Sequence, residues 1–212
     1  KDRAVDYAWE YVTGSLGCEP EQLWATVFAG GTGLGLGEDE VAVAAWQRKG
    51  IPRERIVPFP RSDNFWGPAG ETGPCGPCSE LHIDLTPEGN TKGSLVNTGD
   101  ARCIEIWNLV FIQFNANQDG TFVPLPAQHV DTGMGFERVV SIIQGTKGFT
   151  DFANANISNY NTDIFSPLFA ELEKLTGKSY ASTLPLPGQK SLSEQETTDV
   201  AFRVIADHIR TL

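Results

Sequence analysis

The feature that most restricts the fold is a long stretch of strand-forming residues at positions 103–115, followed at once by a turn. Val, Ile, Phe and Trp recur in this stretch, and such residues favour extended structure. Asn, Gln, Asp and Gly at positions 117–120 are typical of a tight turn, and residues 121–125 continue as a second strand. We therefore expect a β-hairpin, whose two strands are antiparallel.

Other patterns predict further strands and helices around this hairpin. Residues 23–28 and 55–59 have the composition of short strands. Leu81, Ile83 and Leu85 alternate with polar residues, which predicts a strand buried on one face. Apolar residues at helical spacing predict helices at 5–16, 38–49, 136–143, 163–176 and 198–212. Gly, Pro or polar residues predict loops at 60–79, 86–101, 146–162 and 178–195. The predicted fold class is α+β, an antiparallel sheet flanked by helices.

Charged residues and glycines lie at the N-terminal end of one predicted helix. They belong to residues 129–138, whose sequence is His-Val-Asp-Thr-Gly-Met-Gly-Phe-Glu-Arg. A helix N-terminus favours anions, and Arg138 in the first turn suits a phosphate or a base. Asp131 offers the opposite charge and suits an ammonium group, for which we expect it to be buried. Gly133 and Gly135 allow a ligand to approach the backbone closely. The helix face expected to be buried consists of Phe136, Val139, Val140 and Ile143.

A plainer interpretation of the same segment is that Asp131 caps the helix, the glycines form a turn and Arg138 is solvated.

A glycine-rich run at 30–37 lies between a predicted strand and a predicted helix. It lacks the spacing of a phosphate-binding loop, and Glu38, Asp39 and Glu40 follow where a phosphate would bind. We interpret this run as a surface turn.

Composition excludes some classes of function. A net charge of −11 over 212 residues is unlike a stand-alone nucleic-acid binder, which is usually basic. No apolar stretch approaches the roughly 20 residues of a membrane-spanning helix, and we expect no membrane partner. Four cysteines in such a chain indicate a reducing, cytoplasmic environment. Cys75 and Cys78 lack the second pair that a structural zinc site needs, so we expect no zinc here.

Five stretches together resemble the alanyl-tRNA synthetase family of class II aminoacyl-tRNA synthetases. Residues 129–138 are similar to the family's motif 3. The others are Asp-Asn-Phe-Trp at 63–66, Gly-Glu-Thr-Gly-Pro-Cys-Gly-Pro-Cys-Ser-Glu at 70–80, Glu-Ile-Trp-Asn-Leu-Val-Phe-Ile-Gln-Phe-Asn at 105–115 and Arg-Val-Ile-Ala-Asp-His-Ile-Arg at 203–210. The resemblance covers most of the chain and is weakest at 30–37 and 147–193. It implies part of the class II catalytic fold.

The resemblance also implies a reaction and its site. Alanine would be activated with ATP and Mg²⁺ to alanyl-adenylate and then transferred to tRNA(Ala). Asp131 and Arg138 would be the catalytic residues. The residues implied for alanine binding are Trp66, Asn108, Val110, Asp131 and Gly133, and those for ATP are Gly135 and Arg138. Core packing is an open alternative for Trp66 and Val110. Glu105 would hold Mg²⁺, but in a regular strand it faces away from Asn108, so a bulge would be required.

The chain departs from a whole enzyme of this kind. It begins with Lys1, and motifs 1 and 2, the editing region with the family's zinc ligands, and the oligomerisation region are not recognisable. We expect residues 1–195 to be the later part of the aminoacylation domain and residues 196–212 to begin the helical tRNA-recognition region. The chain alone would then be nearly inactive. The alternative is a non-catalytic paralogue that binds an amino acid or nucleotide.

Overall fold

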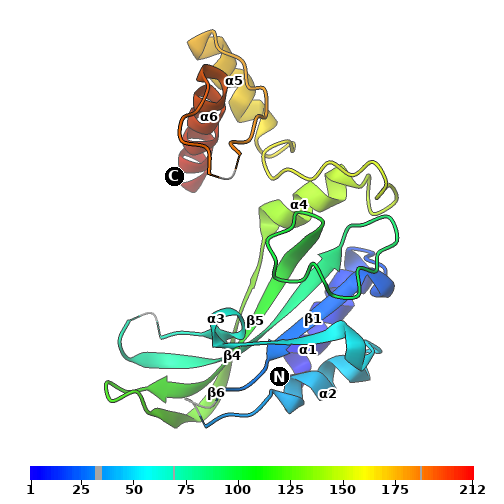
Figure 1. The fold of residues 1–212 in the computed structure, drawn as a ribbon, viewed down its shortest axis with the longest axis vertical. Coiled ribbons are helices and arrows are strands. Elements are labelled where there is room, and N and C mark those ends of the chain that lie inside the picture. The colour runs from blue at the N-terminus through cyan, green and yellow to red at the C-terminus, as the bar shows by residue number, and fades with distance from the viewer. Residues whose placement is uncertain (32–34, 69, 187) are drawn as a thin grey trace. The chain divides into compact units, whose positions relative to one another are not determined.

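The computed structural model describes residues 1–31, 35–68, 70–186 and 188–212, which form two compact units (Figure 1). The first unit comprises Lys1–Phe136 and Asp151–Ala155, and the second comprises Glu137–Thr150 and Asn156–Leu212. The functional boundary expected after residue 195 is a different division and stays a prediction.

A six-stranded sheet forms the centre of the described part of the first unit. Its order is β2 (Ile56–Phe59), β1 (Leu23–Phe28), β4 (Gly73–Asp84), β5 (Cys103–Ala116) and β6 (Phe122–Met134), and β3 (Phe65–Trp66) pairs with β4. The predicted hairpin is confirmed as β5 and β6, which are antiparallel. The α+β class is confirmed, with one correction: β1 and β2 are parallel, so the sheet is mixed.

Two strands extend into segments that were expected to be loops or turns. β4 already begins at Gly73, within the predicted loop 60–79, and that loop also contains β3 and a short helix, α3 (Arg61–Asn64). β6 runs to Met134, far beyond the predicted end at residue 125. Pairing along β5 explains both errors, because a long central strand supplies hydrogen-bond partners to Gly- and Pro-containing neighbours.

Both faces of β4 are buried from Cys75 to Asp84, so the prediction of a half-buried strand was wrong. On one face lie α1 (Asp2–Trp9), which continues as a π-helical turn (Glu10–Ser15), and α2 (Glu40–Arg48) (Figure 1). Trp46 of α2 donates a 2.7 Å hydrogen bond from Nε1 to the Ser79 hydroxyl, and its ring contacts that of Trp9. On the other face, Asn64 of α3 donates to the Thr26 hydroxyl at 2.7 Å.

The second unit has its own core. Its helices are α5 (Ser166–Thr176), α6 (Glu194–Thr211) and most of α4 (Phe136–Gly145). The buried cluster between α5 and α6 consists of Phe165, Phe169, Leu172, Phe202 and Ala206. Gly177 ends α5 in the left-handed conformation, directly after the predicted helix 163–176. α6 begins four residues earlier than predicted, because Ser193 and Glu196 form a reciprocal capping box.

In α4, Val139 and Ile142 are buried, but Phe136 is 55% exposed and does not belong to the buried face that was expected. Of the glycine-rich run, residues 32–34 lie outside the described residues. Around them, Gly31 donates its N–H to the Leu36 carbonyl at 2.9 Å.

Candidate amino-acid and nucleotide site

The residues expected to bind alanine come together through strand register. Asn108 of β5 lies opposite Gly133 of β6, and Val110 lies opposite Asp131. Directly paired residues in neighbouring strands share a face of the sheet, and residues two apart on one strand share it too. All four therefore lie on one face. The helices α1 and α2 cover the opposite face, since Trp46 of α2 contacts the Ser79 side chain. Asn108 pairs with Glu80, the next residue of β4, and successive side chains of a strand lie on opposite faces.

An irregularity in β5 brings Glu105 to the same face. Leu81 pairs with Trp107, and the next residue, His82, pairs with Glu105, so Ile106 is an extra residue in β5. His82 and Glu80 are two apart on β4, and their partners Glu105 and Asn108 therefore share a face. This is the bulge that the proposed role of Glu105 requires; the magnesium role itself stays a prediction.

Trp66 lies beside this face, on β3. It pairs with Gly76 of β4, and its backbone amide approaches the thiol of Cys78. Cys78 in turn pairs with Val110. The Trp66 side chain is 40% exposed, which argues against the alternative that it is a core residue. Val110 is 7% exposed, so its side chain forms part of the packed sheet surface as well as a wall of the candidate site.

Asp131 differs from expectation in two respects. It lies within β6, five positions before α4 begins at Phe136, so it does not cap that helix. It is also exposed rather than buried, as is Gly133, because β6 is an edge strand of the sheet. The carboxylate is therefore open to a solute on the face that it shares with Val110.

Sequence reasoning missed a buried polar cluster next to Asn108. Glu80 accepts hydrogen bonds on Oε2 from the Thr26 hydroxyl at 2.9 Å, from Asn97 Nδ2 at 3.0 Å and from His82 Nε2 at 3.1 Å. The signal was the alternation of Glu80 and His82 with apolar residues, which we interpreted as a solvent-facing side. Packing of α3 and the loop at 85–102 against that side buries these residues instead.

The residues expected to bind ATP divide between the two units. Gly135 donates its N–H to the Ile106 carbonyl at 3.0 Å, which continues the pairing of β6 with the irregular part of β5. Arg138 lies in the first turn of α4, in the second unit, and is exposed. Glu137, the residue before it, forms an ion pair with Arg210, which holds the pKa of Glu137 below its usual range.

Cys75 and Cys78 both lie in β4 and are buried. Burial raises the pKa of the Cys78 thiol to about 12, the opposite of the thiolate that zinc requires. Among the residues that the structure describes, no three His, Cys, Asp or Glu side chains are grouped so as to hold a metal ion. The described helices also include none with the length and apolar character to cross a membrane.

Comparison with known proteins identifies the family of this chain. Residues 1–212 match the family described as tRNA synthetases class II (A). The alanine–tRNA ligase of Akkermansia muciniphila is 54% identical over 222 residues, which cover 100% of this chain and 23% of that protein. That of Methylacidiphilum infernorum is 48% identical, with 100% and 23% covered. The mitochondrial alanine–tRNA ligase of Saccharomyces cerevisiae is 44% identical, with 100% and 20% covered.

The chain thus spans between a fifth and a quarter of the length of these relatives. The family match extends over every residue, including the strands that carry the candidate site and both units of the structure. This protein chain belongs to the class II (A) family of tRNA synthetases.

Proposed function

We propose that the protein containing this chain is an alanine–tRNA ligase, and that the chain supplies the alanine-binding part of its active site. The observation that carries the proposal is the cross-strand alignment of Asn108 with Gly133 and of Val110 with Asp131 on one face. A bound amino acid would there contact the carboxylate of Asp131 and the amide of Asn108. Val110 would give an apolar contact, and Gly133 has no side chain. The reaction would join alanine and ATP as alanyl-adenylate and then transfer alanine to tRNA(Ala).

The polar groups suit the α-ammonium of an amino acid. Asp131 provides an exposed negative charge, and the side-chain oxygen of Asn108 is buried without a hydrogen-bond partner among the described residues. An ammonium group donates three hydrogen bonds, so it suits the Asp131 carboxylate together with an Asn108 amide whose oxygen is turned toward the site. Val110 offers an apolar contact that suits a methyl side chain. Gly133 has no atom within 4 Å of where a Cβ would lie, so the space above it is open to a ligand.

We propose Glu105 of the first unit for Mg²⁺ and Arg138 of the second unit for ATP. Mg²⁺ prefers oxygen ligands and is often held by one or two carboxylates together with substrate phosphates. Glu105 fits that role, since its carboxylate shares the face of Asn108. Arg138 suits the nucleotide because a guanidinium pairs with phosphate and stacks on a base. Catalysis would consist of holding the alanine carboxylate in line with the α-phosphate and stabilising the phosphate charge.

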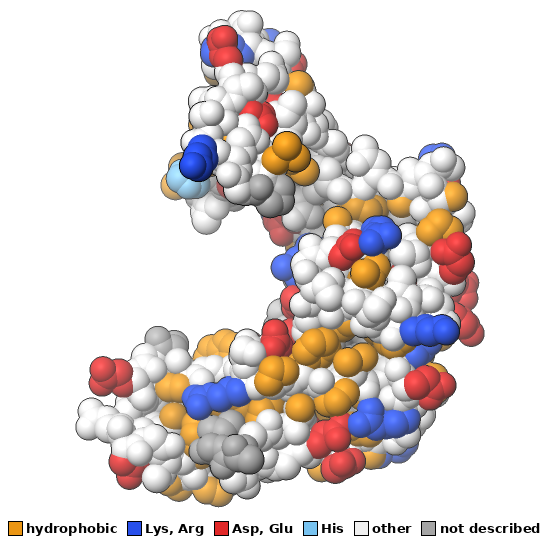
Figure 2. Space-filling model, in the orientation of Figure 1, with side chains coloured by type: hydrophobic (Ala, Val, Ile, Leu, Met, Phe, Trp, Pro, Cys, Tyr) orange, Lys and Arg blue, Asp and Glu red, His pale blue; other side chains and the backbone are white. Residues whose placement is uncertain are grey.

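Recognition of tRNA depends on more than the net charge of this chain, which is −11. On the face drawn in Figure 2, Lys and Arg side chains are interspersed with Asp and Glu, without a broad basic surface among the described residues. Phosphate contacts would then come from local groups or from other parts of the protein.

A non-catalytic paralogue is the alternative function. It would need the fold and a small-molecule site, but it would not need the whole set of substrate-binding side chains. Trp66, Asn108, Val110 and Asp131 are all present, and the last three lie on one face of the sheet, which favours the enzyme.

The decisive experiment is Asp131→Asn in the whole protein, measured by alanine-dependent ATP–pyrophosphate exchange. Loss of a charged hydrogen bond costs about 1.5–3 kcal/mol, so kcat/KM for alanine should fall about 10- to 100-fold. The KM for ATP should change little. Asp119→Asn is a matched control, because Asp119 is an exposed carboxylate in the turn before β6. Absence of alanine-dependent exchange by the unmodified protein would disprove the proposed function, and an unchanged KM in Asp131→Asn would disprove the role of this residue.

A further inference from the structure

The buried carboxylate of Glu80 has an unused oxygen. Its three hydrogen bonds, from Thr26, Asn97 and His82, all reach Oε2. Among the described residues, Oε1 accepts none. A carboxylate can only accept, so the His82 ring carries its proton on Nε2. Burial alone would raise the pKa of Glu80, but the hydrogen bonds from His82, Asn97 and Thr26 outweigh it and lower that pKa. Glu80 is therefore a fixed negative charge at neutral pH.

On the neighbouring strand β5, the residue opposite Glu80 is Asn108. Glu80 and Asn108 are a direct cross-strand pair, so their side chains lie next to each other on one face. The amide of Asn108 makes no side-chain hydrogen bond within the described part of the chain, and its oxygen is buried. A buried amide oxygen without a donor, on the residue paired with a negatively charged carboxylate, is unfavourable in a medium of low dielectric constant.

Rotation of the Asn108 amide by 180° removes this conflict. The two ends of an asparagine amide have nearly the same shape, and their assignment follows from the hydrogen-bond partners. With the NH₂ group toward Glu80 Oε1, the amide donates to the carboxylate and its oxygen turns outward. That oxygen then faces the side on which Gly133 leaves open space.

We propose that Glu80 is a positioning residue that orients the Asn108 amide, so that its oxygen is presented to the α-ammonium of the amino acid. This inference rests on the proposed function. Glu80 acts through Asn108 and not by touching the substrate. A neutral side chain at position 80 can donate as well as accept, so it would no longer select one orientation of the amide.

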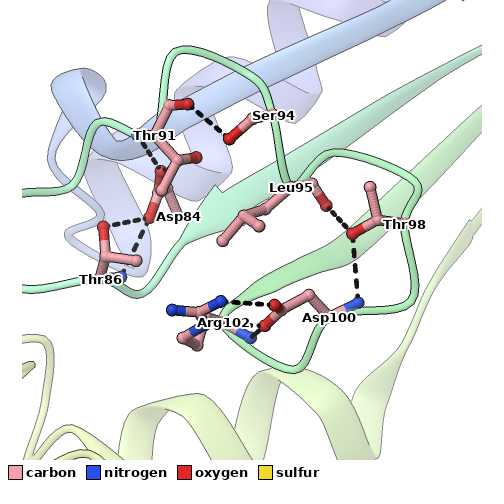
Figure 3. Close-up of polar contacts among 8 residues, drawn as sticks. All are labelled: Asp84, Thr86, Thr91, Ser94, Leu95, Thr98, Asp100 and Arg102. Atoms are coloured by element: carbon pink, nitrogen blue, oxygen red, sulfur yellow. Dashed lines mark hydrogen bonds and ion pairs between the residues drawn. The ribbon is translucent and has the colours of Figure 1, made fainter.

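The surrounding loop holds Glu80 in place for this task. Asn97, which donates to Glu80 at 3.0 Å, has a left-handed backbone conformation with φ 55°. Asp84 anchors the start of its loop by accepting from the amides and hydroxyls of Thr86 and Thr91, as Figure 3 shows. The end of the loop is held by the ion pair between Asp100 and Arg102 at 2.7 Å. The loop thus fixes one oxygen of Glu80 and leaves the other for Asn108.

The test is a double-mutant cycle in the whole protein, read as the KM for alanine in ATP–pyrophosphate exchange. Glu80→Gln should raise that KM about 10-fold while kcat and the KM for ATP change less than about twofold. In the background of Asn108→Ala, which has no amide to orient, Glu80→Gln should change the KM less than about twofold. Asp119→Asn, at an exposed carboxylate in the turn before β6, is the control, and it should leave the KM for alanine near that of the unmodified protein.

Each other outcome has a defined meaning. If Glu80→Gln raises the KM equally with and without the Asn108 amide, the effect is direct or structural and the inference is wrong. The inference is equally wrong if Glu80→Gln leaves the KM unchanged, or if Asp119→Asn raises it as much as Glu80→Gln does. If the unmodified protein shows no alanine-dependent exchange, the proposed function is wrong. The results above instead disprove the role of Glu80 and leave the proposed function in place.

Discussion

At the scale of single residues, carboxylates on buried positions of β4 organise the side of the sheet that carries the candidate site. Asp84 is fully buried and receives two hydrogen bonds on each oxygen, between 2.6 and 3.0 Å, from Thr86 and Thr91 (Figure 3). Burial opposes its ionisation, but these hydrogen bonds outweigh it and lower the pKa of Asp84. Its charge therefore stabilises the folded loop.

Asp84→Asn should lower the free energy of unfolding by about 1–3 kcal/mol at neutral pH, because the amide NH₂ would face N–H and O–H donors. The stabilisation is present above the unfolded pKa of about 4 and is lost as pH falls through the lower folded pKa. Urea unfolding should thus show a gap between the two proteins at pH 7 that narrows below about pH 4. Asp119→Asn, at an exposed carboxylate with a similar Thr partner, is the control. A gap that is constant across this range would contradict the argument.

At the scale of elements, the position of Trp66 depends on close packing of β3, β4 and β5. Gly76 pairs with Trp66, and a Cβ built on Gly76 would lie 1.9 Å from the carbonyl oxygen of Phe111. Only glycine fits there, so a residue that suggested a loop in the sequence is required for strand packing instead.

Gly76→Ala should therefore destabilise the first unit by more than about 2 kcal/mol, since backbone must move to admit the methyl group. Gly133→Ala is the matched control, because nothing lies within 4 Å of its Cβ and it is also in a strand. Its stability should change by less than about 0.5 kcal/mol. Thermal unfolding of both variants measures the difference, and equal stabilities would refute the packing argument.

At the scale of the whole molecule, the two units have separate cores. All five tryptophans, at positions 9, 24, 46, 66 and 107, lie in the first unit. The core of the second unit contains Phe169 of α5 and Phe202 of α6. Helices such as α5 and α6 give rise to its far-ultraviolet circular dichroism signal. Tryptophan fluorescence therefore reports unfolding of the first unit, whereas far-ultraviolet circular dichroism reports both.

Phe202→Ala should destabilise the second unit by about 3–5 kcal/mol, as is usual for a buried phenylalanine. The circular dichroism transition in urea should then show an early phase, while the tryptophan transition stays where it was. Val204→Ala, at a site on the same helix that is 47% exposed, is the control. A parallel shift of both signals in Phe202→Ala would mean that the units unfold as one.

The sequence alone predicted those features that neighbouring residues decide. Strand-forming composition located β1, apolar spacing located most helices, and the strand-forming run with its turn predicted the β5–β6 hairpin. The resemblance of its motifs led to the family. It also selected Trp66, Asn108, Val110 and Asp131, whose roles stay predictions.

Only the tertiary structure decided which of these residues meet. The extra residue Ile106 turns Glu105 to the face of Asn108, and pairing with β5 makes strands of Gly- and Pro-containing segments. Packing of α3 and the loop at 85–102 buries Glu80, which the alternating pattern had placed in solvent. The physical reason is distance along the chain: register and burial depend on contacts between segments about 20 to 60 residues apart, and a local pattern contains no information on them.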